Sequence, residues 1–210
     1  MILQVEVEER FADVNAYFYI DDKTNHGFLI DPGAEPEKLL HIIAEKNFTI
    51  EKILLTHGHF DHLGAVNDIR AKIDLNVVMH KDGRIYAENA DWNFSSHYGS
   101  NITLDTVTYL DDGAEIDLSV NPDFKVKLIS VAGHTADGAI YSAEKDGVAF
   151  VGDSIFLGSY GRTDLPGGDE KALFKNIKTK IFALPDDTVL LSGHTPPTPV
   201  AAEKTRSWFK

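Results

Sequence analysis

Residues 56–62, with the sequence THGHFDH, follow an apolar run and contain four side chains that can bind a metal ion or carry a proton. His57 and His59 are two positions apart, so on an extended loop both imidazoles can point at one ion. Asp61 and His62 come one turn later and can face a neighbouring ion. Four ionisable residues in six positions, directly after an apolar run, are not typical of a solvated loop. The stretch therefore indicates a metal site.

The same pattern recurs at the ends of three later apolar segments. Together with the first, four apolar segments end in a small residue followed by a ligand-type side chain. They are KILLTHGH, VKLISVAGHT, VAFVGDS and DTVLLSGHT. The ligand candidates in the last three are His134, Asp153 and His194. Sites in α/β folds commonly form just beyond strand ends, where rigid elements hold short loops in place. We therefore expect these four strand ends to converge.

The ligand chemistry is restricted because the chain contains no cysteine. Any metal must bind nitrogen and oxygen, and imidazole with carboxylate suits Zn²⁺ and similar ions. Five histidines and two aspartates suffice for two ions if one carboxylate bridges them. Asp153 is the best candidate, since a short carboxylate at a strand end can contact two ions about 3.5–4 Å apart. We expect the backbone to pass close to the ions at Gly58, Gly133, Gly152 and Gly193.

The elements that must position these residues are strands flanked by helices. Alternating or continuous apolar patterns predict strands at residues 2–8, 15–21, 27–31, 50–56, 76–80, 106–110, 114–118, 124–131, 138–144, 147–152 and 187–192. Helical spacing predicts helices at residues 36–46, 62–73, 167–184 and 198–209, the last with Thr198 as N-cap and Pro199 in the first turn. Residues 81–104 have no steady period, which is typical of a binding loop. The order of elements indicates one α/β domain of two halves.

Composition limits the class of partner. The 210 residues carry a formal net charge of -13, which argues against nucleic acid because phosphate binding needs a basic face. No apolar run reaches the roughly 18–20 residues of a membrane helix, and the N-terminal MILQVEVEER does not resemble a secretory signal. We expect a cytoplasmic monomer or small homo-oligomer that acts on a small molecule, without a nucleic-acid or membrane partner.

These motifs together resemble the metallo-β-lactamase superfamily, and within it the glyoxalase II-like branch. The matching motifs occur in the family's order: IDPG at 30–33, THGHFDH at 56–62, GHT at 133–135, GD at 152–153 and GHT at 193–195. The most specific stretch is GDSIFLGSYGRTDLPGGD, which resembles the single-domain hydroxyacylglutathione hydrolase-like proteins. The resemblance covers about residues 2–209.

The resemblance implies an αββα four-layer sandwich with two metal ions at the edge between its sheets. The implied ligands are His57, His59 and His134 for one ion and Asp61, His62 and His194 for the other, with Asp153 as the bridge. We expect Zn²⁺ in both positions, with Fe or Mn as alternatives. Asp31 would hydrogen-bond the ligand loop and fix its geometry, or would form the turn before Pro32.

The implied activity is hydrolysis of a thioester of the hydroxyacylglutathione kind, or of a related ester. A metal-bound hydroxide would attack, and one ion would polarise the carbonyl. Asp61 would be a ligand and would also orient the hydroxide. A thiolate leaving group, whose thiol has a pKa of about 8.5–9, can depart without being protonated first, so the site requires no separate general acid.

Substrate contacts are less clearly marked. Arg162 in YGRTD either binds a substrate carboxylate or forms an internal salt bridge with Asp164 or Asp169. Tyr160 is a substrate-binding candidate of the same kind, with packing as its alternative. The loop at 84–104 is the candidate substrate wall, through Arg84, Tyr86, Trp92, Phe94 and Tyr98, and His97 in the same loop is a further candidate contact. The same aromatic residues are equally expected to cap the core.

The sequence departs from the family in the last ligand motif, SGHTPPTPVAAEKTRSWF, where relatives more often have G-H-G-P-x-T. It also lacks the usual proline after the first GHT. We expect residues 1–210 to form a single domain, without the C-terminal helical domain with which glyoxalase II enzymes hold glutathione. The substrate is therefore to be sought in contacts from residues 84–104, 158–169 and 194–199.

Three other functions are alternatives to hydrolysis, and two of them are disfavoured. Persulfide dioxygenases share the scaffold and the GRTD stretch, and hold one iron through positions that correspond to His57, His134 and Asp153. A non-catalytic, metal-stabilised binding protein is disfavoured, because structural zinc sites are usually closed and four-coordinate. RNA processing, which also occurs in the superfamily, is disfavoured by the acidic charge balance.

Overall fold

The computed structural model describes residues 1–8 and 13–207, and its N-terminal part forms a six-stranded sheet. The strands lie in chain order across the sheet, with β1 to β3 antiparallel and β3 to β6 parallel. Their bounds are β1 Ile2–Glu8, β2 Asp13–Ile20, β3 His26–Ile30, β4 Thr49–Leu54, β5 Asn76–His80 and β6 Val107–Leu110.

The second part of the chain forms another six-stranded sheet, in the order β14-β13-β10-β9-β8-β7. Only β10 and β13 pair in parallel. The bounds are β7 Glu115–Asp117, β8 Lys125–Ser130, β9 Ala139–Ala143, β10 Val148–Gly152, β13 Val189–Ser192 and β14 Thr198–Pro199. A separate small hairpin joins β11 (Ile155–Phe156) to β12 (Ser159–Tyr160).

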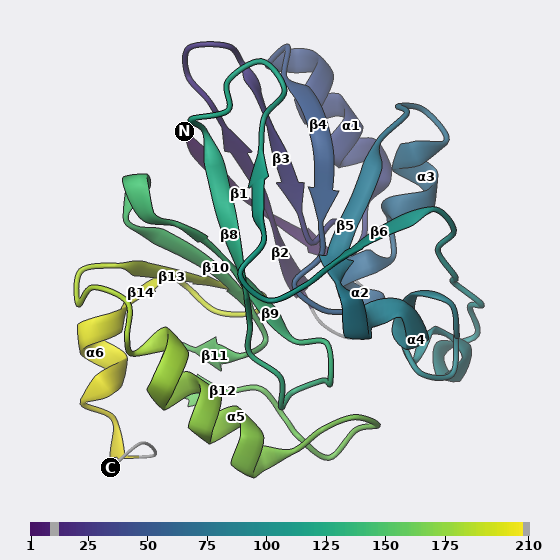
Figure 1. Ribbon diagram of the computed structural model, residues 1–210. Coiled ribbons are helices and arrows are strands. Elements are labelled where there is room, and N and C mark those ends of the chain that lie inside the picture. Colours follow the sequence, from purple (N-terminus) through teal and green to yellow (C-terminus); the bar gives the residue numbers. More distant parts are fainter. Residues whose placement is uncertain (9–12, 208–210) are drawn as a thin grey trace.

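Helices cover the outer faces of the two sheets (Figure 1). On the first sheet these are α1 (Pro36–Glu45) and α3 (Val66–Arg70), and on the second α5 (Glu170–Asn176), which continues as a π-helical turn to Ile181, and α6 (Val200–Lys204). The remaining short helices are α2 (Phe60–Leu63) and α4 (Arg84–Ala87), with 3-10 turns at Lys81–Gly83, Ser95–Tyr98 and Glu144–Asp146. No helix among the described residues is long and apolar enough to cross a bilayer.

Strand alternation explains why the protein has four layers. Successive side chains of a strand point to opposite faces of a sheet. In β2, Phe18 packs into the core beneath α1 and α3, whereas Tyr17 and Tyr19 pack between the two sheets. In β10, Phe150 likewise faces the first sheet and Val151 faces the core beneath α5 and α6. Because both sheets are apolar on both faces, the αββα sandwich expected from the sequence is confirmed.

The strand predictions agree with the structure to within one or two residues, except that β11, β12 and β14 were not predicted. The predicted helix at 62–73 is wrong as a single helix, because it is divided into α2 and α3. At the break Gly64 packs against the carbonyl of Gly33, and Ala65 N–H donates to Pro32 O at 2.9 Å. The Pro-Gly turn after β3 therefore takes the hydrogen bond that a continuous helix would make.

The predicted helix at 198–209 begins later than expected. Thr198 and Pro199 pair with β13 as strand β14, so Pro199 occupies the N-cap of α6 and Thr198 does not cap the helix. The helix ends at Lys204, and the last part of the predicted span, residues 208–209, lies outside the described residues. Pro199 is tolerated in this strand because β14 is an edge strand of the second sheet.

Candidate metal centre

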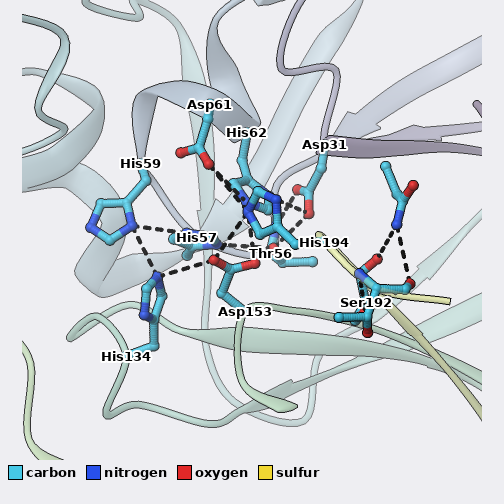
Figure 2. A network of polar contacts seen from close by, with 12 residues as sticks. Asp31, Thr56, His57, His59, Asp61, His62, His134, Asp153, Ser192 and His194 are labelled. Carbon is cyan, nitrogen blue, oxygen red and sulfur yellow. Dashed lines mark hydrogen bonds and ion pairs between the residues drawn. The ribbon is translucent and has the colours of Figure 1, made fainter. Parts of the chain in front are cut away.

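The four strand ends marked by the sequence converge at one edge between the two sheets. The loops after β4, β8, β10 and β13 bring together seven side chains from both halves of the chain, and Figure 2 shows them pointing toward one another: His57, His59, Asp61, His62, His134, Asp153 and His194. Three overlapping groups of these residues each place their ligand atoms within 4.8 Å of one another. The arrangement expected from the sequence pattern is thus present, and binding of a metal by these residues stays a prediction.

The first group consists of three imidazoles that face a common point. His59 Nδ1 lies 3.1 Å from His57 Nε2 and 3.0 Å from His134 Nε2. A tetrahedral Zn²⁺ holds nitrogen ligands at about 2.0–2.1 Å, which corresponds to about 3.3 Å between nitrogens. The three ring nitrogens are therefore spaced to share one ion with little adjustment.

The second group lies beside the first and contains Asp61, His62 and His194. His194 Nε2 is 3.3 Å from Asp61 Oδ2, and His62 Nε2 is 3.7 Å from the same oxygen. The Asp153 carboxylate lies between the groups: its Oδ2 is 3.6 Å from His134 Nε2 and 3.3 Å from His194 Nε2. Asp153 is therefore placed where a bridging ligand would have to be.

Backbone carbonyls fix the orientation of two rings. His134 Nδ1–H donates to the carbonyl of Arg162 at 2.7 Å, and His194 Nδ1–H donates to the carbonyl of Asp13 at 2.7 Å. When Nδ1 carries the proton, the Nε2 lone pair of the neutral ring is free to bind a metal. Both of these Nε2 atoms face the centre of the cluster.

Asp31 lies beneath the ligand loop, directly after β3. Its Oδ1 accepts Thr56 N–H at 2.8 Å, and its Oδ2 accepts the Thr56 hydroxyl at 2.7 Å and His62 Nδ1–H at 3.0 Å. Asp31 is 2% exposed and has φ 48, in the left-handed region that few residues other than glycine adopt. The structure thus gives Asp31 hydrogen bonds to the loop and a place in the turn before Pro32, so the two alternatives are compatible.

The chemistry of the cluster fits a divalent cation. Burial and the neighbouring imidazoles hold the pKa of His57 well below its usual value and lower that of His59 to about 3, so both rings are neutral. His62 Nε2 and Asp153 Oδ1 are buried, lie 3.3 Å apart as an ion pair, and make no hydrogen bond within the described residues. Neutral imidazole nitrogens and unsatisfied carboxylate oxygens are the ligands that ions of the zinc and iron type accept.

The electrostatics of the second group differ from those of the first. Burial lowers the pKa of His62, but the carboxylates of Asp153, Asp61 and Asp31 outweigh it and raise that pKa well above its usual value. Hydrogen bonds to Asp153 and Asp61 likewise outweigh burial at His194 and raise its pKa to about 10. In the metal-free protein, the two imidazolium ions therefore offset part of the negative charge of these three carboxylates.

Gly193 allows the last ligand loop to approach the cluster. A Cβ at this position would lie 2.5 Å from Asp153 Oδ1 and 2.6 Å from His62 Cε1. At Gly58, Gly133 and Gly152 a Cβ would instead collide with Tyr86, Leu173 and Thr56, respectively. The expectation that the backbone passes close to the ions at these four glycines stays a prediction.

The comparison with known families agrees with this geometry. The family model described as "Metallo-beta-lactamase superfamily" matches residues 10–194. The chain belongs to the metallo-β-lactamase superfamily. Membership supports an enzyme with a hydrolase-type metal site, and the resemblance inferred from the motifs is confirmed.

The relatives of the chain in sequence include proteins whose names state a function. The chain is 36% identical over 196 residues to "Probable metallo-hydrolase YqgX" of Bacillus subtilis (strain 168), covering 93% of this chain and 91% of that protein. It is 31% identical over 192 residues to "Hydroxyacylglutathione hydrolase GloC" of Haemophilus influenzae (strain ATCC 51907 / DSM 11121 / KW20 / Rd), covering 90% and 89%.

Two solved structures resemble the whole fold. "BLEG-1 B3 metallo-beta-lactamase" superposes with a TM-score of 0.92 at 32% identity, covering 100% of both chains. "TTHA1623 in a di-iron-bound form" superposes with a TM-score of 0.86 at 32% identity, covering 98% of this chain and 99% of that one. The second structure carries iron, so likeness to these structures does not itself select zinc.

In this superfamily member a cavity of about 950 Å³ opens onto the candidate ligands. Its lining includes the aromatic residues Phe60, Phe94, Tyr98 and Phe156, together with His97, Arg162, Glu6, Asp13 and Asn15. Of the predicted substrate wall, Phe94 and Tyr98 reach the cavity, whereas Arg84 and Trp92 are absent from its lining. Tyr86 is buried, and its hydroxyl donates to Pro166 O and accepts Ala136 N–H.

The two predicted substrate-binding residues have different positions. Arg162 lines the cavity, but its guanidinium forms a two-point salt bridge with Asp164, with contacts of 2.7 and 2.8 Å. Its carbonyl orients His134, so Arg162 is tied to the site through its backbone. Tyr160 is not among the cavity-lining residues, and its ring packs on Phe174 with the centroids 4.6 Å apart. Substrate contact by either residue stays a prediction.

Sequence reasoning missed the residues of β2 that hold the last ligand loop. Asn15 Nδ2 donates to Ser192 O at 3.0 Å, and Asn15 N–H donates to Gly193 O at 2.7 Å. The Tyr17 hydroxyl donates to Ser192 O at 2.7 Å. The available signal was a buried polar residue, Asn15, inside an otherwise apolar strand, because such a group requires a specific partner.

Proposed function

We propose that this protein is a dinuclear metal-dependent hydrolase of thioesters of the hydroxyacylglutathione kind. The observation that carries the proposal is the pair of adjoining ligand groups with Asp153 between them, open to a cavity. The relative named hydroxyacylglutathione hydrolase, 31% identical along nearly the whole chain, supports the choice of substrate class. Zn²⁺ is our proposed metal, since the ligands are imidazoles and carboxylates.

Each side chain has a role in this proposal. His57, His59 and His134 hold one ion, and Asp61, His62 and His194 hold the other, with Asp153 shared. When bound, the ions would supply an activated water and would polarise the substrate carbonyl. Asp61, whose side chain is 16% exposed and lines the cavity, accepts a hydrogen bond from the attacking water and orients it.

The leaving group explains why a thioester is favoured over an amide. A thiolate has a pKa of about 8.5–9 and departs without prior protonation. The ring nitrogens of His134 and His194 that do not face the cluster are already used by backbone carbonyls. Neither ring is therefore available as a general acid, which favours a substrate whose leaving group needs none.

The decisive experiment measures metal content and turnover together. We expect close to two metal ions per chain by elemental analysis, hydrolysis of S-lactoylglutathione or a simpler thioester, and no oxygen consumption. Asp153→Ala should lose at least one ion and at least about a hundredfold in kcat/KM, because the ligand between the sites is removed. The exposed Asp187→Ala is the matched control and should leave both unchanged.

Two outcomes would contradict the proposal. About one iron per chain with persulfide-dependent oxygen uptake would identify a mononuclear dioxygenase. The structural likeness to a B3 metallo-β-lactamase motivates a parallel assay with a β-lactam. Faster turnover of the β-lactam than of any thioester would replace the proposed substrate class.

A further inference from the structure

Asp137 is a buried carboxylate to which the proposed function gives no role. The residue is 1% exposed and follows His134 in the loop between β8 and β9. Neither of its carboxylate oxygens makes a hydrogen bond within the described residues, and the hydroxyl of Thr135 in the same loop makes none either. A buried carboxylate without partners costs free energy, so its presence in a folded protein calls for an explanation.

Three donors face the carboxylate of Asp137 without reaching hydrogen-bond geometry. They are the Thr135 hydroxyl and the backbone N–H groups of Gly58 and of Asp137 itself. Burial raises the pKa of Asp137 to about 7 although these donors oppose the rise, and the charge of Asp82 adds to it. Of the three donors only Gly58 belongs to a distant segment of the chain. The carboxylate is therefore turned toward the ligand loop that follows β4.

The packing of Asp137 against Gly58 is close. A Cβ on Gly58 would lie 3.4 Å from Asp137 Oδ2 and 2.3 Å from Tyr86 Cβ, so the absence of a side chain leaves room for both residues. A Cβ on Gly83 would lie 3.0 Å from the same carboxylate oxygen. Gly58 separates two histidines of the first group. The carboxylate of Asp137 thus adjoins the peptide that sets the spacing of two candidate ligands.

The loop of Asp137 is fixed on both sides of this residue. Ala139 N–H donates to Thr56 O at 2.9 Å, which joins the loop to the first residue of the motif THGHFDH. Ala136 N–H donates to the Tyr86 hydroxyl at 3.1 Å. Because the backbone is bonded before and after Asp137, the carboxylate is presented to the ligand loop from a defined position.

The second group already has a buried carboxylate of this kind. Asp31 accepts His62 Nδ1–H at 3.0 Å, in addition to the N–H and the hydroxyl of Thr56. In the first group, by contrast, His59 Nε2 is buried and has no hydrogen-bond partner within the part of the chain that the structure describes. The orientation of His59 therefore depends on the backbone of its loop, which Asp137 adjoins.

We propose that Asp137 is a positioning residue for the first group, holding the Gly58 peptide so that His57 and His59 face one ion. The inference rests on the two-ion site of the proposed function and does not depend on the substrate. Removal of outer partners that orient metal ligands typically lowers metal affinity about 10–100-fold. Because Gly58 lies within the first group and Asp31 supports the second, the effect of Asp137 is confined to the first ion.

The test isolates each group in its own background. In His194→Ala the first group remains complete, and in His134→Ala the second group remains complete. Asp137→Ala and Asp137→Asn are introduced into both backgrounds, and Zn²⁺ affinity is measured by competition with a chromophoric chelator. Asp82→Asn is the matched control, because Asp82 carries a charge near Asp137 but its own side chain is 56% exposed.

We expect Asp137→Ala to weaken Zn²⁺ binding about 10–100-fold in the His194→Ala background and to leave it unchanged in the His134→Ala background. Asp137→Asn keeps one acceptor oxygen and should lose about fivefold in the first background only, since hydrogen bonds to neutral acceptors are weaker than those to charged ones. Asp82→Asn should change neither affinity.

Site selectivity and partial rescue by asparagine distinguish positioning from a general loss of structure. Equal losses in the two backgrounds, or no loss in His194→Ala, would overturn the proposal, and so would an Asn variant that loses as much as the Ala variant. Thermal unfolding of the metal-free proteins checks that each variant folds. If Asp137→Ala does not fold, the isosteric Asp137→Asn carries the test, and the absence of its selective loss overturns the proposal.

The titrations separate this inference from the proposed function. If the parent protein binds two ions but the Asp137 variants leave both affinities unchanged, the two-ion site stands and the inference alone fails. If the selective loss is found but no thioester is hydrolysed, the proposed hydrolase function fails and the positioning role stands. If the parent protein binds no ion, both fail.

Discussion

At the scale of single residues, the candidate histidine ligands differ in their protonation state before a metal binds. His57 and His59 are buried among other imidazoles and are neutral, so an ion meets free lone pairs. His62 and His194 are buried among carboxylates and hold protons in the metal-free protein. An ion entering the second group must displace those protons, whereas an ion entering the first group displaces none from His57 or His59.

Metal affinity at the second group should therefore rise with pH. The pKa of His194 is raised to about 10, so its proton is bound in the metal-free protein throughout pH 6–8 and released on metal binding. Each displaced proton gives about a tenfold rise in affinity per pH unit. Titration at pH 6, 7 and 8 should show this slope for the weaker ion, and His194→Ala should reduce it by one proton. A pH-independent affinity for both ions would contradict the charge assignment.

These protons illustrate what the sequence could and could not reveal. The motif THGHFDH and the three later strand ends were sufficient to select the seven residues, because ligand type and position are visible in the chain. The partners of each ring are not visible. The carbonyls of Asp13 and Arg162 orient His194 and His134 through the backbone, to which any residue type can contribute.

At the scale of elements, the site depends on loops that run directly from strand ends. The turn after β13 passes close to the candidate ligands, because Gly193 lies against both Asp153 and His62. The strands were predicted well, since alternation and apolar runs are strong signals. The division of α2 from α3 and the strand β14 were missed, because both follow from contacts with distant segments, Pro32 and Val189.

A methyl group at Gly193 should disturb the cluster without removing a ligand. In Gly193→Ala the new Cβ would meet Asp153 Oδ1 at 2.5 Å, so the carboxylate or the loop has to move. We expect metal affinity to fall about 10–100-fold, as for other losses of ligand orientation. Competition with a chromophoric chelator measures this change. Gly147→Ala is the control: it has open space around its Cβ and a positive φ of 62, so it should cost stability and leave the affinity unchanged.

At the scale of the whole molecule, the candidate centre joins two sheets. Four ligands come from the loop and helix after β4 in the first sheet, and three from loops after strands of the second sheet. The four-layer architecture could be anticipated through the family resemblance, and both sheets have the apolar faces that it requires. The hydrogen bonds by which β2 holds the last ligand loop could not be anticipated, because Asn15 and Ser192 are far apart in sequence.

Removal of metal should therefore lower the stability of the entire protein. A ligand present at a hundred times its dissociation constant stabilises the folded state by about 2.7 kcal/mol. For a chain of this size that corresponds to a decrease in Tm of about 5–10 °C on chelation. Thermal unfolding with and without a chelator measures it, and Asp153→Ala should respond much less. An unchanged Tm in wild-type protein that has lost its metal would show that the ions do not hold the sheets together.

The chain order of the ligands has a consequence for biosynthesis. Ribosomes make proteins from the N-terminus, so His57 to His62 emerge before the residues of the second sheet have been translated. The first three-histidine group is complete only when His134 has been added, and the second only with His194. Under the proposed ligand assignment, neither group can hold an ion with its full set of ligands before that point of synthesis. We therefore expect the dinuclear centre to form only when nearly the whole chain has been made.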